Sequence, residues 1–299
     1  MTAVAAPPLA KTAAPKRRHP ILAFCISQPL GAAGAVSILV MAIAAVFAEY
    51  VAPYDPVAID FGAMLAPPTL EHWFGTDAFG RDILTRVIYG ARTALAIGFL
   101  SSLLGCTVGA ILGVASAYFG GRIDMAIQRL VDILLSFPII VLALVVVAML
   151  GRNMLLGIDF NLILAIAVPT MPRVARVVRS AALSIRELPY IDAARVQGFS
   201  HARIIFRHMV PNVAAPYLIM FTAAIAQAIL LEASLSFLGL GVTEPTPAWG
   251  LMLSGNASDF YREAPWMILF PGLAISVAVF AFNLFGDSLR DWLDPKFKT

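Results

Sequence analysis

Charged side chains are scarce in this chain. Asp, Glu, Lys and Arg together make up 13 % of its 299 residues, whereas soluble domains carry about 25 %. Hydrophobic residues make up 60 %, and the few charges are clustered, which leaves long apolar gaps. This composition excludes an ordinary soluble domain and indicates a protein that crosses the membrane several times.

Cysteine and histidine are also rare. Cys25 and Cys106 are the two cysteines, and both lie in or near apolar runs without a CxxC spacing. Neither a disulfide framework nor a zinc site is therefore expected. His201 and His208 lie seven residues apart on a possible helix, but no acidic or cysteine ligand accompanies them, so we interpret them as loop residues. The sequence predicts no metal and no cofactor.

The chain has only four lysines, and none of them follows a glycine. It therefore lacks the phosphate-binding loop of an ATPase. The apolar segments also contain no Ser/His or double-Asp arrangement of the kind an intramembrane hydrolase needs. We predict that the chain is not an enzyme and that any ATP hydrolysis takes place in partner subunits.

The apolar segments predict an all-α integral membrane protein with six transmembrane helices. The expected spans are residues 30–48, 93–121, 133–151, 160–178, 209–231 and 264–286. The fourth is the weakest, because only residues 160–172 are free of charge, which is fewer than the ~20 residues that a crossing needs. Residues 155–157 before this run and 174–178 after it are needed to complete the crossing. Pro138, Pro169 and Pro172 are expected to kink their helices.

The N-terminal region allows two interpretations. Residues 1–18 are rich in Ala and Pro and end in Lys-Arg-Arg, which is typical of a disordered tail. The basic start and the small residues Ala45 and Ala48 also fit a signal peptide. We favour a retained anchor, because the apolar run exceeds the 7–15 residues of a signal peptide core.

Arginine and lysine are distributed unevenly between the two sides of the six-span arrangement. Sixteen lie in the parts proposed as cytoplasmic and four in the outer parts, while Arg92 is at a boundary. Such a bias predicts that both termini are cytoplasmic. The expected division is a cytoplasmic tail (1–29), a first span (30–48), an extracytoplasmic segment (49–91), a membrane core (92–287) and a second cytoplasmic tail (288–299).

Residues 187–212 form the longest polar stretch between apolar segments in the second half of the chain. Pro189 suits the first turn of a short helix, and Gly198 suits the position just past its end. Ser200 is a candidate cap for a second helix, which Pro211 is expected to end. Two short helices with several arginines make a possible docking surface; the alternative is an ordinary basic loop.

Acidic residues inside the apolar segments are few. Glu232 is the clearest, and it lies near the outer end of the fifth span. A structural contact or a helix cap is the favoured role, with substrate contact as the alternative. Asp124 and Asp132 are expected to form local ion pairs with Arg122 and Arg129.

The order of residues in the 187–212 segment resembles the EAA loop of bacterial ABC importer permeases. That loop has Glu-Ala-Ala, three residues, Gly, and Leu-Pro about a dozen residues later. In this chain the corresponding residues are 192–194 (Asp-Ala-Ala), Gly198 and Pro211. Asp192 replaces the Glu and Val210 replaces the Leu.

Further motifs resemble the C-type subunit of the dipeptide, oligopeptide and nickel permeases. They are GTD–GRD at 75–82, Ser-Phe-Pro at 136–138, EASLSFLGLG at 232–241, Pro-Ala-Trp-Gly at 247–250 and the segment 265–295. The resemblance implies the type I ABC importer permease fold in the bacterial plasma membrane, the inner membrane of a Gram-negative cell.

The resemblance also implies partners: a B-type permease subunit as heterodimer partner, two ATP-binding subunits and an extracytoplasmic solute-binding protein, with membrane lipid around them and no nucleic acid. The loop would seat in a groove of the ATPase, with both adjacent alanines facing that groove. The implied coupling residues are Tyr190, Asp192, Ala193, Ala194, Arg195, Gly198, Arg203 and Pro211.

The cargo implied by the resemblance is a dipeptide or oligopeptide. Nickel, glutathione and opines are alternatives within the same family. A secondary transporter is the alternative from a different class, but such a protein needs coupling-ion sites within the membrane, and the spans have few acidic residues there.

Overall fold

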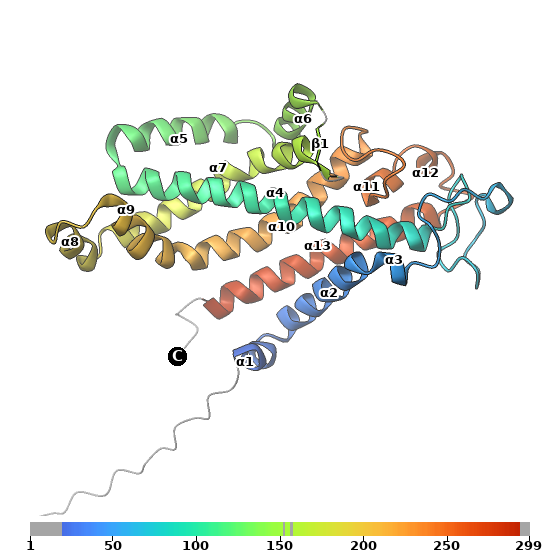
Figure 1. Cartoon of the computed structure of the whole chain (residues 1–299), viewed down its shortest axis with the longest axis horizontal. Helices are drawn as coiled ribbons and strands as arrows, with labels where there is room; N and C mark the ends of the chain where they lie inside the picture. The colour runs from blue at the N-terminus through green and yellow to red at the C-terminus, as the bar shows by residue number, and fades with distance from the viewer. Residues whose placement is uncertain (1–19, 152, 156–157, 294–299) are drawn as a thin grey trace, which may run out of the picture.

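The computed structural model describes residues 20–151, 153–155 and 158–293. Five long helices lie side by side and form the body of the molecule (Figure 1). They are α2 (Pro29–Val46), α4 (Ile83–Phe119), α7 (Phe160–Arg186), α10 (Ala214–Phe237) and α13 (Trp266–Leu293). Each is long and apolar enough to cross a membrane, α10 together with the turns that precede it. The all-α membrane architecture is confirmed, while the tail at 1–18 lies outside the described residues.

The third predicted span is not one continuous helix. It is divided between α5 (Gly121–Leu135) and α6 (Ile139–Leu150), whose axes differ by 96°. Pro138 lies at the break, where its missing N–H and fixed φ favour the end of a helix. The two helices make a sixth crossing only if the bent pair is taken as one span.

The fourth predicted span is confirmed as a helix, and it is longer than expected. α7 contains Pro169 and Pro172 without ending at either. Asp159 caps its first turn by accepting hydrogen bonds from the backbone of Asn161 and Leu162. α4 is also longer than expected, because it begins at Ile83, ten residues before the predicted start, where Asp82 caps it by accepting from the Thr85 N–H at 2.7 Å.

A small-residue stripe brings α4 and α7 together, and this is the most extensive helix contact in the fold. A Cβ added at Gly109 would lie 2.6 Å from the Met171 carbonyl oxygen. The same close approach to α7 backbone occurs one turn to either side, at Gly105 and Gly113. Glycine at every fourth position therefore lets the two backbones touch.

Short elements complete the two ends of the bundle. α8 (Pro189–Val196) and α9 (His201–Ile204) lie at one end, called here the α8 end, and α11 (Trp249–Met252) and α12 (Asn256–Asp259) lie at the other, the α11 end (Figure 1). The remaining elements are α1 (Pro20–Ser27), α3 (Ala48–Val51), a 3₁₀ turn (Phe61–Ala63) and a two-stranded hairpin of β1 (Met154–Leu155) and β2 (Ile158–Asp159). The start of α1 and the end of α13 both point toward the α8 end (Figure 1).

The expectation that Pro211 ends the second short helix is wrong. α9 continues directly into a π turn (Ile205–Met209), a 3₁₀ turn (Val210–Val213) and then α10. Pro211 is in the first turn of the 3₁₀ segment, where a missing N–H is tolerated. The segment at 187–212 therefore passes into the fifth span without a break.

Candidate functional site

The first short helix of the 187–212 segment has well-defined ends. Pro189 is its first residue, and Gly198 follows it with φ +73°. The Gly198 N–H donates to the Arg195 carbonyl at 2.9 Å, and the Phe199 N–H donates to the Ala194 carbonyl at 3.1 Å. This pair of bonds is a Schellman motif, which fixes the turn after α8.

Ser200 caps α9, as the sequence predicted, by accepting from the Arg203 N–H at 3.3 Å. The turn between α8 and α9 is therefore held from both sides by local hydrogen bonds. Because each bond is formed within a few residues, this geometry belongs to the segment itself and needs no partner protein.

The expectation that both adjacent alanines face outward is wrong for Ala194. It is 4 % exposed and packs, with Ile191, in a core cluster formed with α4 and α7. Ala193, the next residue of α8, is exposed. One alanine therefore packs the helix against its own chain, and the other is free to meet another surface.

The outward face of α8 carries mixed chemistry. Asp192, Ala193 and Gln197 are exposed, and Val196 is 89 % exposed. Asp192 forms an i,i+3 ion pair with Arg195 at 2.9 Å. Val196 is therefore an exposed apolar side chain beside an ion pair that is accessible to solvent. Together they give α8 both apolar and polar groups for contact with another protein.

The segment is also attached to the rest of the chain by polar contacts. The Tyr118 hydroxyl and His201 Nδ1 are 2.7 Å apart, and Arg186 donates to the Ala117 carbonyl at 2.8 Å. Arg203 stacks over the Phe199 ring at 4.0 Å. The Asn212 amide donates to the Tyr190 hydroxyl at 3.2 Å. The Tyr118–His201 contact therefore joins the segment to α4, the Arg186 bond joins the end of α7 to α4, and the other two contacts lie within the segment.

The expected local ion pairs of α5 are wrong. Asp124 pairs with Arg179, and Asp132 pairs with Arg176, so both partners come from α7 rather than from α5. Both pairs join α5 to α7, which a pair within α5 could not do. Among the described residues, no group of three or more His, Cys, Asp or Glu side chains has the arrangement of a metal site.

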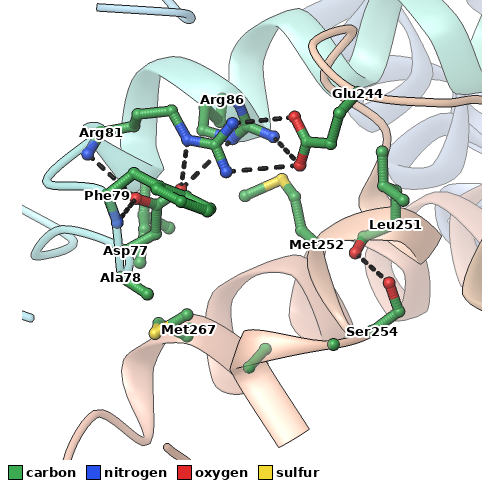
Figure 2. Close-up of a pocket in the computed structure, with 13 residues that line it drawn as sticks. Asp77, Ala78, Phe79, Arg81, Arg86, Glu244, Leu251, Met252, Ser254 and Met267 are labelled. Atoms are coloured by element: carbon green, nitrogen blue, oxygen red, sulfur yellow. Dashed lines mark hydrogen bonds and ion pairs between the residues drawn. The ribbon is translucent and has the colours of Figure 1, made fainter. Parts of the chain in front are cut away.

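A charged pocket lies at the α11 end (Figure 2). Its volume is about 270 Å³. Its charged groups are Asp77, Arg81, Arg86 and Glu244, and apolar side chains from α11 and the start of α13 close the other side (Figure 2). The four charges balance, and the Arg86 side chain is 1 % exposed.

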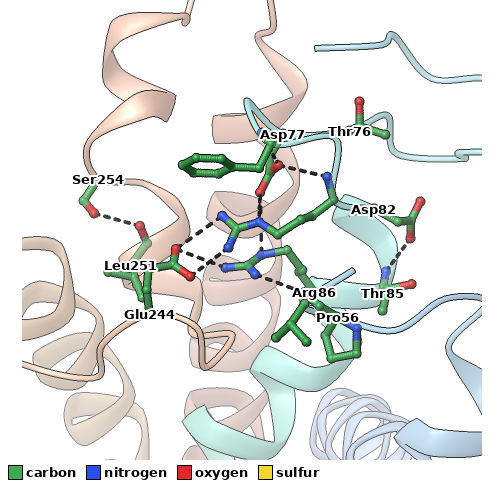
Figure 3. Close-up of polar contacts among 12 residues, drawn as sticks. Pro56, Thr76, Asp77, Asp82, Thr85, Arg86, Glu244, Leu251 and Ser254 are labelled. Carbon is green, nitrogen blue, oxygen red and sulfur yellow. Dashed lines mark hydrogen bonds and ion pairs between the residues drawn. The ribbon is translucent and has the colours of Figure 1, made fainter. Parts of the chain in front are cut away.

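The charges of this pocket are joined in one network (Figure 3). Arg81 donates to Asp77 at 2.6 Å and to Glu244 at 2.8 Å. Arg86 donates to Glu244 at 3.4 Å and to the Pro56 carbonyl at 3.1 Å. The network therefore fastens the 53–82 segment and the first turn of α4 to the loop that follows α10.

The network shifts the titration of its members outside the spans. Burial alone would raise the pKa of Glu244, but the Arg81 hydrogen bond and the Arg86 charge outweigh it and lower that pKa. Burial alone would lower the pKa of Arg81, but the bonds and charges of Glu244 and Asp77 raise it overall. Both groups are therefore held in their charged forms.

Sequence reasoning singled out the GTD–GRD turn but missed Arg86 and Glu244. Arg86 was counted only as an outer charge, although it follows Asp82 by one helical turn. Glu244 lies 158 residues further along the chain. No local pattern signals that pairing, because it depends on where α10 returns to α4.

Glu232 is 1 % exposed near the end of α10. Its Oε1 accepts from the Ser236 hydroxyl at 2.6 Å, and the Ser236 oxygen accepts from the Val242 N–H at 3.0 Å. Its Oε2 has no hydrogen-bond partner within the described part of the chain. These contacts connect α10 to the turn that follows it, so they stabilise the local structure. A role of Glu232 in transport remains a prediction.

Comparison with known families now gives the class of the protein. Residues 105–299 match the family described as the binding-protein-dependent transport system inner membrane component. Residues 26–68 match the N-terminal transmembrane domain of oligopeptide transport permease C. The first match covers more than half of the chain, so the chain belongs to the binding-protein-dependent transport permeases.

Relatives agree with this assignment over most of their length. The chain is 43 % identical to the dipeptide transport system permease protein DppC of Alkalihalophilus pseudofirmus, over 90 % of this chain and 87 % of the relative. It is 41 % identical to the glutathione transport system permease protein GsiD of Escherichia coli, over 91 % of this chain and 88 % of the relative.

Among solved structures, the inward-facing MetNI methionine ABC transporter has a similar fold. The TM-score is 0.54 at 19 % identity, with 71 % of this chain and 98 % of the other chain covered. The protein is therefore a permease subunit of an ABC importer, a multi-pass inner-membrane protein, and not itself an enzyme. ABC importers in general work with ATPase subunits and a binding protein.

Proposed function

We propose that this permease forms half of a translocation pathway for dipeptides or oligopeptides. The observation that carries the proposal is the identity of 43 % to a dipeptide permease across 90 % of the chain. A relative named for glutathione transport shows similar identity, so glutathione is the second candidate cargo. No catalytic residue is assigned, since the energy comes from ATP hydrolysis in partner subunits.

The proposed partners are a B-type permease subunit, two ATP-binding subunits and an extracytoplasmic solute-binding protein. Alternating access then requires that ATP-driven closure of the ATPase pair reaches the spans. The α8–α9 unit suits this task, because its outward face is exposed while its inward face packs on α4 and α7. Asp192, Ala193 and Arg195 would meet the ATPase, and Gly198 would set the angle of α8.

The proposed topology places the α8 end and both termini in the cytoplasm, and the α11 end and residues 49–91 outside. The distribution of Arg and Lys supports this direction. The start of α1 and the end of α13 point toward the α8 end, which agrees with an even number of crossings (Figure 1). The remaining proposed divisions are those of the sequence: 1–29 and 288–299 as tails, 30–48 as the first span and 92–287 as the core.

Single-cysteine labelling tests the topology. In a background without Cys25 and Cys106, cysteines at the exposed positions Gln197 and Ser258 are expected to react from opposite sides of the membrane. A membrane-impermeant maleimide should reach only position 258 in intact cells. Reaction of both positions from outside would overturn the topology.

Reconstitution tests the function. The chain purified alone should show no ATPase activity, and the complete complex in liposomes should take up peptides only with ATP and loaded binding protein. Uptake of glutathione without uptake of other peptides would select the second cargo. Proton-driven uptake by this chain alone would contradict the assignment to an ATP-driven importer.

A further inference from the structure

A second cavity lies within the spans, away from the charged pocket. It has a volume of about 190 Å³ and is formed where α6, α7, α10 and α13 meet. Polar side chains contributed by three of these helices line it: Thr170, Arg173, Gln227 and Asn283. A polar cavity is unexpected among helices selected for crossing a lipid bilayer.

These residues lie well inside the length of their helices. Arg173 is the middle residue of α7, 13 residues and about 20 Å from each end. A crossing of about 20 residues that starts at Phe160 includes it. Gln227 is likewise near the middle of α10. Intramembrane arginines are costly, and those that persist face a bundle interior or a water-filled cavity.

Arg173 differs from the other arginines of α7. Arg176 and Arg179 pair with the acids of α5, and Arg186 pairs with Glu187. For Arg173 no ion pair or hydrogen bond is found with any described residue, and the same holds for the amides of Gln227 and Asn283. The cavity therefore presents one guanidinium and two amide groups whose donors are free.

This donor set fits a carboxylate. The planar guanidinium donates two parallel bonds to a carboxylate, and each amide adds N–H donors for its remaining lone pairs. The volume is below the 300–1,000 Å³ of sites that enclose a whole drug-sized ligand. The cavity therefore suits one end of an extended molecule rather than all of it.

We infer that Arg173, Gln227 and Asn283 form a transient binding site for the C-terminal carboxylate of a peptide in passage. This inference rests on the proposed peptide cargo. Arg173 and Asn283 are exposed on this chain, so a peptide in the pathway can reach their donors. It acts after the binding protein has delivered the cargo and before release into the cytoplasm.

The test uses the complete transporter in liposomes, with a dipeptide supplied as the free acid and as its C-terminal amide. Uptake is divided by the ATP hydrolysed in the same vesicles. This ratio removes differences in how well the binding protein recognises the two peptide forms. Arg173→Gln is expected to lower free-acid uptake per ATP about tenfold, the loss of a charge-assisted contact. Arg173→Lys should keep part of it, and amide uptake should not change.

Arg176→Gln is the matched control, one turn along α7, with an exposed pair to Asp132. It should leave uptake per ATP within about twofold, because exposed pairs contribute little. If the wild-type complex moves only the free acid, the test compares free-acid uptake per ATP in Arg173→Gln with that in Arg176→Gln. A loss in Arg173→Gln alone supports the site. Unchanged uptake in Arg173→Gln, or an equal loss for acid and amide, would overturn the site.

Two further outcomes separate this inference from its alternatives. Loss of the partner permease from purified Arg173→Gln complexes would show that Arg173 pairs with an acid of that subunit, which contradicts a cargo site. A wild-type complex that moves no peptide in either form would contradict the proposed cargo itself. Normal wild-type uptake with an unaffected variant contradicts only the site.

Discussion

The two ends of the bundle use charge in opposite ways. At the α11 end, Asp77, Arg81 and Arg86 are nearly removed from solvent and are bonded to one another and to Glu244. At the α8 end, the side chains of Asp192 and Arg195 are 65 % and 40 % exposed and form a single pair. Buried charges that satisfy one another hold one shape, whereas exposed charges can exchange their partner for another protein.

On the proposed function, this difference suits the two ends to different mechanical tasks. The charged pocket fastens three segments that lie far apart in the sequence, so it should resist movement. The α8–α9 unit is fixed within itself by its turn, yet its outer face is uncommitted. A unit that transmits movement from one protein to another needs a rigid backbone and a free face. A flexible unit would deform instead of moving the helices behind it.

The largest effect is expected from Asp77→Ala. Asp77 accepts from the Arg81 side chain and from the backbone N–H groups of Phe79 and Arg81. Its loss leaves two buried arginines with a single half-exposed acid, which should cost about 3 kcal/mol of stability. Thermal unfolding of the purified complex measures the loss. Glu71→Ala, an exposed acid in the same segment, should change little; equal stability of both variants would show that the network is not structural.

Gly198→Val should have the next largest effect, at the other end of the bundle. A side chain at φ +73° costs roughly 1 kcal/mol, and a β-branched one more. An added Cβ meets no atom within 4 Å, so the cost is conformational only. We expect normal insertion with reduced ATP-coupled uptake. Gly198→Asn, which tolerates this conformation, should retain most uptake; equal uptake in all three proteins would make the turn irrelevant.

A smaller effect is expected from pH at the α11 end. The pKa of Glu244 is lowered in the folded protein from 4.5. Its contribution is therefore complete above pH 4.5 and is lost as pH falls below that value through the folded pKa. The difference in melting temperature between wild type and Glu244→Gln should narrow below pH 4.5. A difference that is constant from pH 6 to pH 4 would contradict the ion-pair role.

The smallest stability effect is expected from Asp192→Ala. Its pair with Arg195 is exposed, so its loss should change stability by less than about 1 kcal/mol. Uptake should nevertheless fall if Asp192 meets the ATPase. A melting temperature lowered as far as in Asp77→Ala would remove the contrast between the two ends.

Local signals predicted the local features well. Pro189, Gly198 and Ser200 have the positions that their backbone chemistry favours, and five of the apolar runs are long helices. These features depend on residues close in sequence. The motif resemblance supplied the family, which composition alone did not.

Features that depend on distant contacts were missed or wrong. Whether Ala193 or Ala194 faces outward depends on how α8 packs on α4 and α7, and the partners of Asp124 and Asp132 lie 55 and 44 residues away. The kink at Pro138 was predicted, but not that one helix ends there and the next turns by 96°, because the apolar run at 133–151 crosses the break without a change in hydropathy. Hydrophobic periodicity predicts neither which face of a short helix is packed nor which distant helices come into contact.

Ala193→Trp tests the coupling surface most directly. Ala193 is exposed and faces away from the core that holds Ala194, so a large side chain there leaves the chain's own packing intact. The measurement is recovery of the ATPase subunits with the purified permease, together with peptide uptake in the same membranes, against Ala193→Ser. The coupling account predicts normal insertion, loss of most ATPase subunits and loss of uptake in the Trp variant alone. Normal recovery and normal uptake would mean that α8 is only a connector.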